Sequence, residues 1–131
     1  MKYLGIDYGL KRVGIAVSDE DEKIAFARTV LTNDSLLLTE VETLCKAENI
    51  AGIVIGESNK LSGEPNDLMV HVREFTKDLE TKIGLPVYFE PEFFTSVEAE
   101  RLQGKNSMHD ASAAAIILKS FLDKKFHANN N

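Results

Sequence analysis

Residues 4–19 read LGIDYGLKRVGIAVSD, a stretch in which two apolar runs flank a short turn that contains Gly9. This pattern predicts two antiparallel strands, over residues 3–7 and 13–18, joined by a tight turn. Asp7 interrupts the end of the first apolar run. A carboxylate at a strand end lies on the rim of the sheet, so Asp7 is the first candidate site residue.

The rest of the chain continues this fold as further strands and helices. A third strand is expected over residues 23–30, and the acidic run before it reads as a solvated hairpin loop. Apolar spacing and capping residues then predict a helix from Ser35 to about Asn49, a strand over 50–56 and a helix from Pro65 to Gly84. A strand over 87–89, a short helix from Thr95 and a last helix from Ser107 follow. Three antiparallel strands followed by helix–strand–helix–strand imply an α/β fold. Its five-stranded mixed sheet, flanked by helices, has the ribonuclease H-like order.

Size and composition fit one domain over residues 1–125, with residues 126–131 as a disordered tail. The chain has 131 residues, 44% of them hydrophobic, and no apolar stretch long enough to span a bilayer. We expect a cytoplasmic protein without membrane partners. Its single cysteine, Cys45, lies among apolar residues and is expected to be a buried, inert thiol.

Two more carboxylates occupy informative positions: Glu92 just past the last strand and Asp110 at the start of the last helix. Asp110 shares a helical stripe with apolar residues that pack on the sheet, where an unpaired charge is costly. Each acid also has a simpler interpretation. Asp7 could cap its turn, Glu92 could be an exposed loop acid, and Asp110 could form a capping box with Ser107.

Carboxylates that converge favour a hard divalent cation, Mg²⁺ or Mn²⁺. Two such ions about 3.5–4 Å apart activate water and stabilise the leaving oxygen of a phosphodiester. In this interpretation Asp7 bridges both ions, while Glu92 and Asp110 each hold one side. The three acids would then be the catalytic and metal-binding residues of a hydrolase.

The sequence resembles a known family along nearly its whole length. The resemblance rests on residues 6–19, on Gly56 and Gly63, on EFFTSVEAE over 92–100, and on Asp110 followed by AAAIIL over 113–118. These motifs are similar to those of the YqgF (RuvX) family of Holliday-junction-resolvase-like nucleases. The resemblance implies a ribonuclease H-like fold, metal-dependent phosphodiester hydrolysis and a role in ribosome biogenesis, the maturation of the 5′ end of pre-16S rRNA. Branched DNA is the alternative substrate, and the protein is expected to be a monomer or a weak homodimer.

The chain departs from the family pattern near the expected site. Glu57-Ser58 stands where the family usually has leucine-proline, and Pro91, Phe93 and Phe94 replace an aspartate, an arginine and a leucine around Glu92. Glu57 is either a fourth metal ligand, since RuvC-type resolvases take a glutamate from that strand, or a solvated rim acid. The departures leave open a second function, a catalytically impaired protein that binds RNA or a ribosomal partner. A nucleotide-binding module is less favoured, because that use of the opening motif needs two domains.

A nucleic-acid edge must be small in a chain with 15 basic and 21 acidic residues and a net charge of −6. Lys11 and Arg12 follow Asp7 directly, within reach of phosphates that flank a scissile bond, and Lys60 and Lys105 are candidates from loops. Ordinary solvated lysines and arginines are the alternative. His109, beside Asp110, could contact a phosphate or carry a proton, or have no role.

Overall fold

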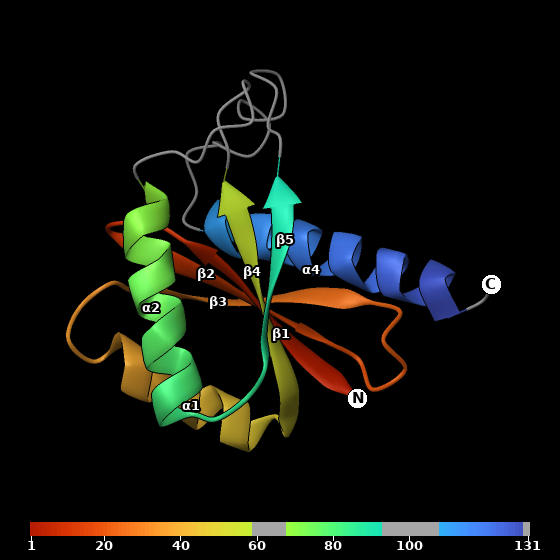
Figure 1. The fold of residues 1–131 in the computed structure, drawn as a ribbon, viewed down its shortest axis with the longest axis horizontal. Helices are drawn as coiled ribbons and strands as arrows, with labels where there is room; N and C mark the ends of the chain where they lie inside the picture. The colour runs from red at the N-terminus through yellow and green to blue at the C-terminus, as the bar shows by residue number, and fades with distance from the viewer. Residues whose placement is uncertain (59–67, 93–107, 130–131) are drawn as a thin grey trace.

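The computed structural model describes residues 1–58, 68–92 and 108–129, which form one mixed sheet with helices on both faces (Figure 1). The strands in the sheet follow the order β3-β2-β1-β4-β5. In chain order the elements are β1 Lys2–Tyr8, β2 Arg12–Ser18, β3 Ala25–Thr32, α1 Leu37–Ala47, β4 Ile50–Ser58, α2 Leu68–Lys82, β5 Val87–Glu92 and α4 Met108–Asn129.

The pairing of the strands follows the predicted topology. β1 pairs with β2 and β2 with β3 in antiparallel ladders, whereas β1 pairs with β4 and β4 with β5 in parallel. Each parallel connection needs a crossover, and α1 supplies the one between β3 and β4. The five-stranded ribonuclease H-like sheet expected from the sequence is therefore confirmed.

One face of the sheet packs against α1 and α2. Alternate strand residues such as Leu4, Ile6 and Ile55 contribute to this core, and both helices place their apolar stripes against it. Cys45 belongs to the same core, where burial raises the pKa of its thiol to about 11. The expected inert cysteine is consistent with this environment, because the reactive thiolate form is scarce at neutral pH.

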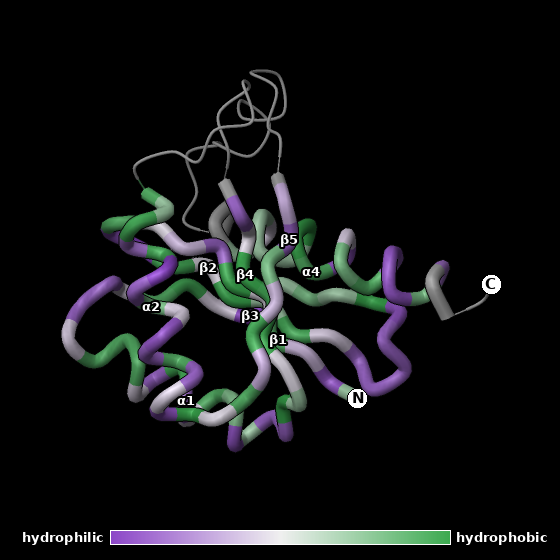
Figure 2. Tube along the Cα trace, in the orientation of Figure 1, coloured by the Kyte–Doolittle hydropathy of each residue, from purple (hydrophilic) through white to green (hydrophobic). Residues whose placement is uncertain are grey.

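The opposite face packs against α4, and half of the buried residues of this helix are alanines. Ala111, Ala114 and Leu118 are fully buried, and the cluster on this face includes Ala16 and Val54 from the sheet. Small side chains let a helix approach a sheet closely. Figure 2 shows the distribution of hydropathy along the chain: hydrophobic residues lie in the central strands and hydrophilic ones at the β2–β3 connection.

Helix ends agree with the prediction at two positions and differ at a third. Asn49 (φ 55°) and Gly84 (φ 77°) adopt left-handed conformations just after α1 and α2 and end them as expected. Ser35 does not cap α1: the N-cap is Leu36, without a side-chain cap bond, and the carboxylate of Asp34 accepts the amide of Leu36 instead (2.9 Å). An aspartate two residues ahead of the amide forms an Asx turn, which takes the place of the serine cap.

Other expectations need correction or lie outside the described residues. The helix α4 continues through residues 126–129, so a disordered tail beginning at residue 126 is wrong for these four positions. The expected starts at Pro65 and Ser107 and the short helix from Thr95 lie outside the described residues. In the part of the chain that is described, no helix is long and apolar enough to cross a membrane.

Candidate functional site

The candidate site lies at the C-terminal ends of β1, β4 and β5, which run parallel and therefore end on the same side of the sheet. Figure 1 shows the ends of β4 and β5 next to each other at this edge. Asp7 is the penultimate residue of β1, and Glu92 is the last residue of β5. The topology therefore brings the backbones of these two predicted ligands to the same edge.

Contacts along β1 show how α4 aligns with this strand. The Tyr3 ring lies 5.6 Å from the Phe121 ring and 5.8 Å from the Lys125 Nζ, whereas a Cβ at Gly5 would contact Ala114 and Leu118. Residues closer to the C-terminal end of β1 thus lie against residues closer to the N-terminus of α4. One further step from Gly5 to Asp7 leads to the first turn of α4, where Asp110 lies.

Strand alternation assigns Asp7 to the face that α4 covers. Leu4 and Ile6 belong to the core under α1 and α2, whereas Tyr3 and Gly5 contact α4. Asp7 continues the second series and is half-buried. This is the face that the metal-site hypothesis requires for Asp7.

The other two acids are described only by their backbones. Glu92 pairs with Ser58, two residues after the Gly56–Glu90 pair, and Asp110 is the third residue of α4. Among the described residues, which do not include the side chains of Glu92 and Asp110, no group of three histidine, cysteine or acidic side chains could hold a metal. The convergence of three carboxylates therefore stays a prediction.

Glu57 is the penultimate residue of β4 and faces the opposite side of the sheet from Asp7. Ile53 and Ile55 belong to the core under α1 and α2, and Val54 to the cluster under α4. Alternation thus assigns Glu57 to the side of α1 and α2, opposite to Asp7. This phase favours the interpretation of Glu57 as a rim acid over that of a fourth ligand.

The candidate nucleic-acid residues fall into two groups. Lys11 and Arg12 are exposed, at the turn between β1 and β2, which adjoins the end of β1 that carries Asp7. The Lys11 carbonyl accepts the Asn33 amide (2.9 Å), which ties this turn to the end of β3. Lys60 and Lys105 lie outside the described residues, and so does the side chain of His109.

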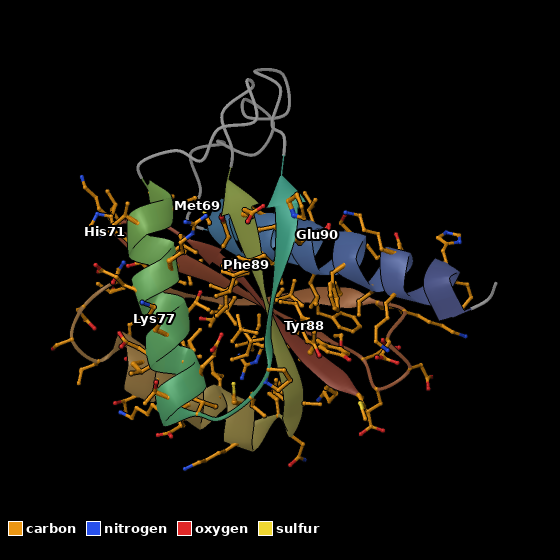
Figure 3. The ribbon with its side chains drawn as sticks, in the orientation of Figure 1. Met69, His71, Lys77, Tyr88, Phe89 and Glu90 are labelled. Atoms are coloured by element: carbon orange, nitrogen blue, oxygen red, sulfur yellow. The ribbon has the colours of Figure 1, made fainter. Side chains whose placement is uncertain are left out.

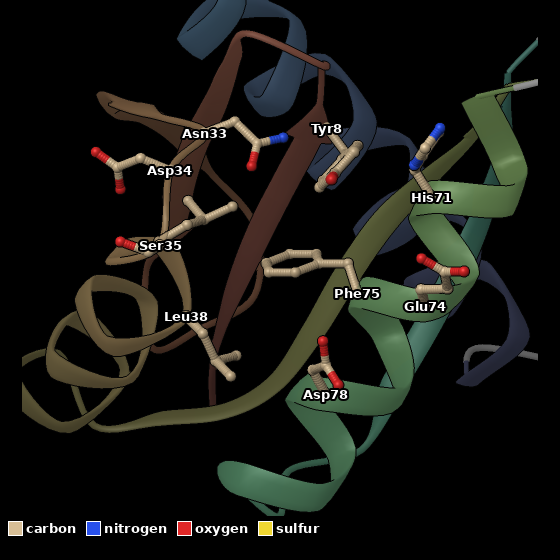
Figure 4. Close-up of a pocket in the computed structure, with 10 residues that line it drawn as sticks. Tyr8, Asn33, Asp34, Ser35, Leu38, His71, Glu74, Phe75 and Asp78 are labelled. Atoms are coloured by element: carbon tan, nitrogen blue, oxygen red, sulfur yellow. The ribbon is translucent and has the colours of Figure 1, made fainter.

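A cavity of about 320 Å³ opens on the α2 side of the sheet (Figure 4). Tyr8 and Phe75 stack at a ring distance of 5.1 Å within it. Its polar lining includes three carboxylates, those of Asp34, Glu74 and Asp78. Grouped carboxylates repel phosphate, so this cavity is not a favourable site for a nucleic-acid backbone.

Sequence reasoning did not identify Glu90, which has the most unusual environment of the described acids. It is 2% exposed and lies on β5 (Figure 3). Its carboxylate accepts hydrogen bonds from Lys124 (2.6 and 3.0 Å) and Ser120 (3.1 Å) of α4. The available signal was an acid directly after the apolar residues of β5 and before Pro91. That signal reads equally well as the solvated end of a strand.

This sheet order, with acids at the ends of its parallel strands and at the start of the last helix, defines a protein of the ribonuclease H-like class. A family model described as RuvX, Holliday junction resolvase, matches residues 1–124. The chain therefore belongs to the RuvX family.

Similar proteins and structures agree with this assignment. The chain is 36% identical to a Maridesulfovibrio salexigens protein over 93% of its own length and 98% of the relative's, and 30% identical to a Rickettsia conorii protein over 92% and 84%. Both relatives carry the name "Putative pre-16S rRNA nuclease". Among solved structures, Thermus thermophilus RuvC with a Holliday junction substrate has a TM-score of 0.61 at 18% identity (96% of each chain), and the fowlpox virus Holliday junction resolvase has 0.56 at 14% (95% and 99%). At these identities the structures support the shared fold.

Proposed function

We propose that this protein is a nuclease that hydrolyses phosphodiester bonds with the aid of Mg²⁺ or Mn²⁺, and that its substrate is the 5′ region of pre-16S rRNA. The names of its relatives support the substrate, since the matches cover 93% and 92% of this chain and 98% and 84% of the relatives. Asp7, Glu92 and Asp110 are the proposed ligands and catalytic residues.

The observation that carries the proposal is the position of Asp7. Its carboxylate belongs to the face that α4 covers, at the edge where β5 ends and α4 begins. Oxygen donors are the ligands that Mg²⁺ and Mn²⁺ prefer, so the proposed set fits such an ion.

Each protein group has a defined task in the proposed reaction. A bound divalent cation supplies an activated water and neutralises charge on the phosphate. Asp7, Glu92 and Asp110 would hold this cation through their carboxylate oxygens. Lys11 and Arg12 hold the phosphates beside the scissile bond and thereby align it with the acids.

Cation binding by Asp7 is tested with the variant Asp7→Asn, which preserves the shape of the side chain and removes its charge. Manganese at about a hundred times its Kd stabilises a protein by about 2.7 kcal/mol, which corresponds to roughly 10 °C in Tm for a domain of this size. We expect this rise in the parent and a much smaller one in Asp7→Asn, measured by thermal unfolding with and without MnCl₂. Cleavage of a labelled precursor fragment should disappear in the variant.

Two further variants separate the proposed ligands from other acids. Asp78→Asn removes a carboxylate on the opposite side of the sheet and should leave both the manganese response and cleavage unchanged. Glu57→Gln should behave in the same way if the phase of β4 excludes it from the site. Cleavage by Asp7→Asn at the rate of the parent would contradict the proposal, and cleavage of a four-way DNA junction but not of the RNA would overturn the substrate.

A further inference from the structure

We propose that Glu90 is a positioning residue that ties β5 to α4 and so holds Glu92 and Asp110 in register with each other. This inference rests on the proposed metal site and names a further requirement of that site. It follows from three features of Glu90: its burial, its partners and its distance in sequence from Glu92.

The burial of Glu90 makes its pairing asymmetric. The Glu90 side chain is 3% exposed, whereas that of Lys124 is 63% exposed, so the lysine comes from the surface to a carboxylate within the protein. Such a carboxylate loses most of its hydration, and removing its cationic partner is strongly unfavourable. The pair is therefore a firm connection between two elements, unlike an exposed ion pair.

The partners of Glu90 both belong to α4, the helix that carries Asp110. Lys124 Nζ donates to both carboxylate oxygens, and Ser120 Oγ donates to Oε2. These two donors lie four residues apart, so they face the strand from one side of the helix. A rotation or sliding of α4 relative to β5 would break all three bonds together.

The position of Glu90 in β5 connects this contact to the site. β5 is an edge strand with a single neighbour, β4, and it ends two residues after Glu90, at Glu92. The next residue, Pro91, has no amide hydrogen to donate to a ladder. The contact with α4 is thus the last side-chain anchor described in β5 before the proposed ligand.

Glu90 also lies in the same row of the sheet as Asp7. Gly56 pairs with Glu90, and the β1–β4 register, continued by one residue, sets Asp7 beside Gly56. Because a glycine separates them, no side chain fills the space between Asp7 and Glu90 within this row. The anchor is therefore close enough for a shift of β5 to reach the proposed site.

The test compares Lys124→Met and Glu90→Gln with the parent by titrating manganese calorimetrically at a temperature where each protein is folded. We expect Kd for manganese to rise by about tenfold or more, the scale found when residues that orient metal ligands are changed. Lys124→Arg keeps the charge and the donors and should restore the parent's Kd. Lys124→Met changes the exposed partner, so it provides the measurement if Glu90→Gln does not fold.

A matched control comes from the same helix. Lys119 pairs with Asp123 at 2.7 Å, but both side chains are half-exposed and neither contacts β5 in the described interactions. Lys119→Met should therefore leave Kd for manganese unchanged. A loss of stability in Lys124→Met with an unchanged Kd would overturn the positioning role and leave Glu90 as a structural residue.

The same titration distinguishes failure of this inference from failure of the proposed function. If Asp7→Asn abolishes manganese binding while Lys124→Met and Glu90→Gln bind like the parent, the metal site stands and the positioning role is wrong. If the parent itself shows no binding that depends on Asp7, both are wrong.

Discussion

The close approach of α4 to β1 at Gly5 can be tested with one methyl group. An ideal Cβ at Gly5 would lie 2.8 Å from the Leu118 Cβ and 2.9 Å from the Ala114 carbonyl oxygen. Carbon atoms in contact prefer about 3.5 Å or more, so Gly5→Ala requires a shift of roughly 0.7 Å. The atoms in the way belong to a helix backbone and to a Cβ, which cannot move by a change of rotamer.

The expected cost is the difference between two effects. Overpacking of a core costs about 1–3 kcal/mol, while replacing a strand glycine by alanine returns about 0.5–1 kcal/mol of backbone entropy. These ranges differ by about 0–2.5 kcal/mol, and because the obstructing atoms cannot move aside we expect Gly5→Ala to lose about 1–2 kcal/mol of unfolding free energy. For a domain of this size that corresponds to a Tm lower by roughly 3–10 °C.

Gly52→Ala provides the matched comparison. Its Cβ would meet only ring atoms, at 2.9 and 3.1 Å from Tyr3 and 3.3 Å from Tyr88, and rings can turn away. Urea unfolding followed by circular dichroism should show a larger loss for Gly5→Ala than for Gly52→Ala. Gly5→Ala should also weaken manganese binding, because it displaces the helix that carries Asp110. Equal stability of Gly5→Ala and parent would refute the close packing of α4 on β1.

Two further predictions concern charge. Reversing Lys11 and Arg12 together to glutamate should weaken binding to a precursor-rRNA fragment and reduce the slope of log affinity against log salt by roughly one to two, since each phosphate contact contributes about 0.7–0.9; an unchanged slope in filter binding would remove this turn from the interface. Lys2 donates to Glu48 at 2.9 Å and holds the pKa of that carboxyl below its usual 4.5, with Arg28 contributing. A lowered carboxyl pKa stabilises the fold above the unfolded-state value, and the stabilisation is lost as pH falls through the folded-state value. Glu48→Gln should thus lower Tm slightly at about pH 7 and not at about pH 3, and a pH-independent difference between the two proteins would show that the ion pair is not responsible.

Much of the fold could be predicted from the sequence because its signals are local. Apolar alternation, a glycine in a tight turn and apolar residues at helical spacing predicted the five strands and, among the described residues, the helices α1, α2 and α4 in the right order. The N-cap of α1 was missed because Asp34 and Ser35 are both good capping residues, and the choice between them depends on how the chain leaves β3. The end of α4 was missed because Asn129 is a poor helix former whose helix is extended from the packed residues before it.

Site residues were harder to predict because their partners are distant in sequence. Asp7 could be proposed as a site residue from the sequence, since an acid at the end of an apolar strand is a visible exception to a local pattern. The role of Glu90 depends on Ser120 and Lys124, which lie 30 and 34 residues away. No local pattern indicates that a surface lysine reaches a buried carboxylate.

Glu57 shows why the face of a strand residue can be undetermined even when the strand itself is predicted correctly. β4 is apolar on both faces, so its hydrophobic pattern has no period that would distinguish one face from the other. Its phase follows only from register: Val54 pairs with Gly5, and Gly5 lies under α4. A shift of one residue in this pairing would move Glu57 to the face of Asp7. Whether an acid at the end of this strand can join the site is therefore decided by a pairing between residues that lie far apart in the chain.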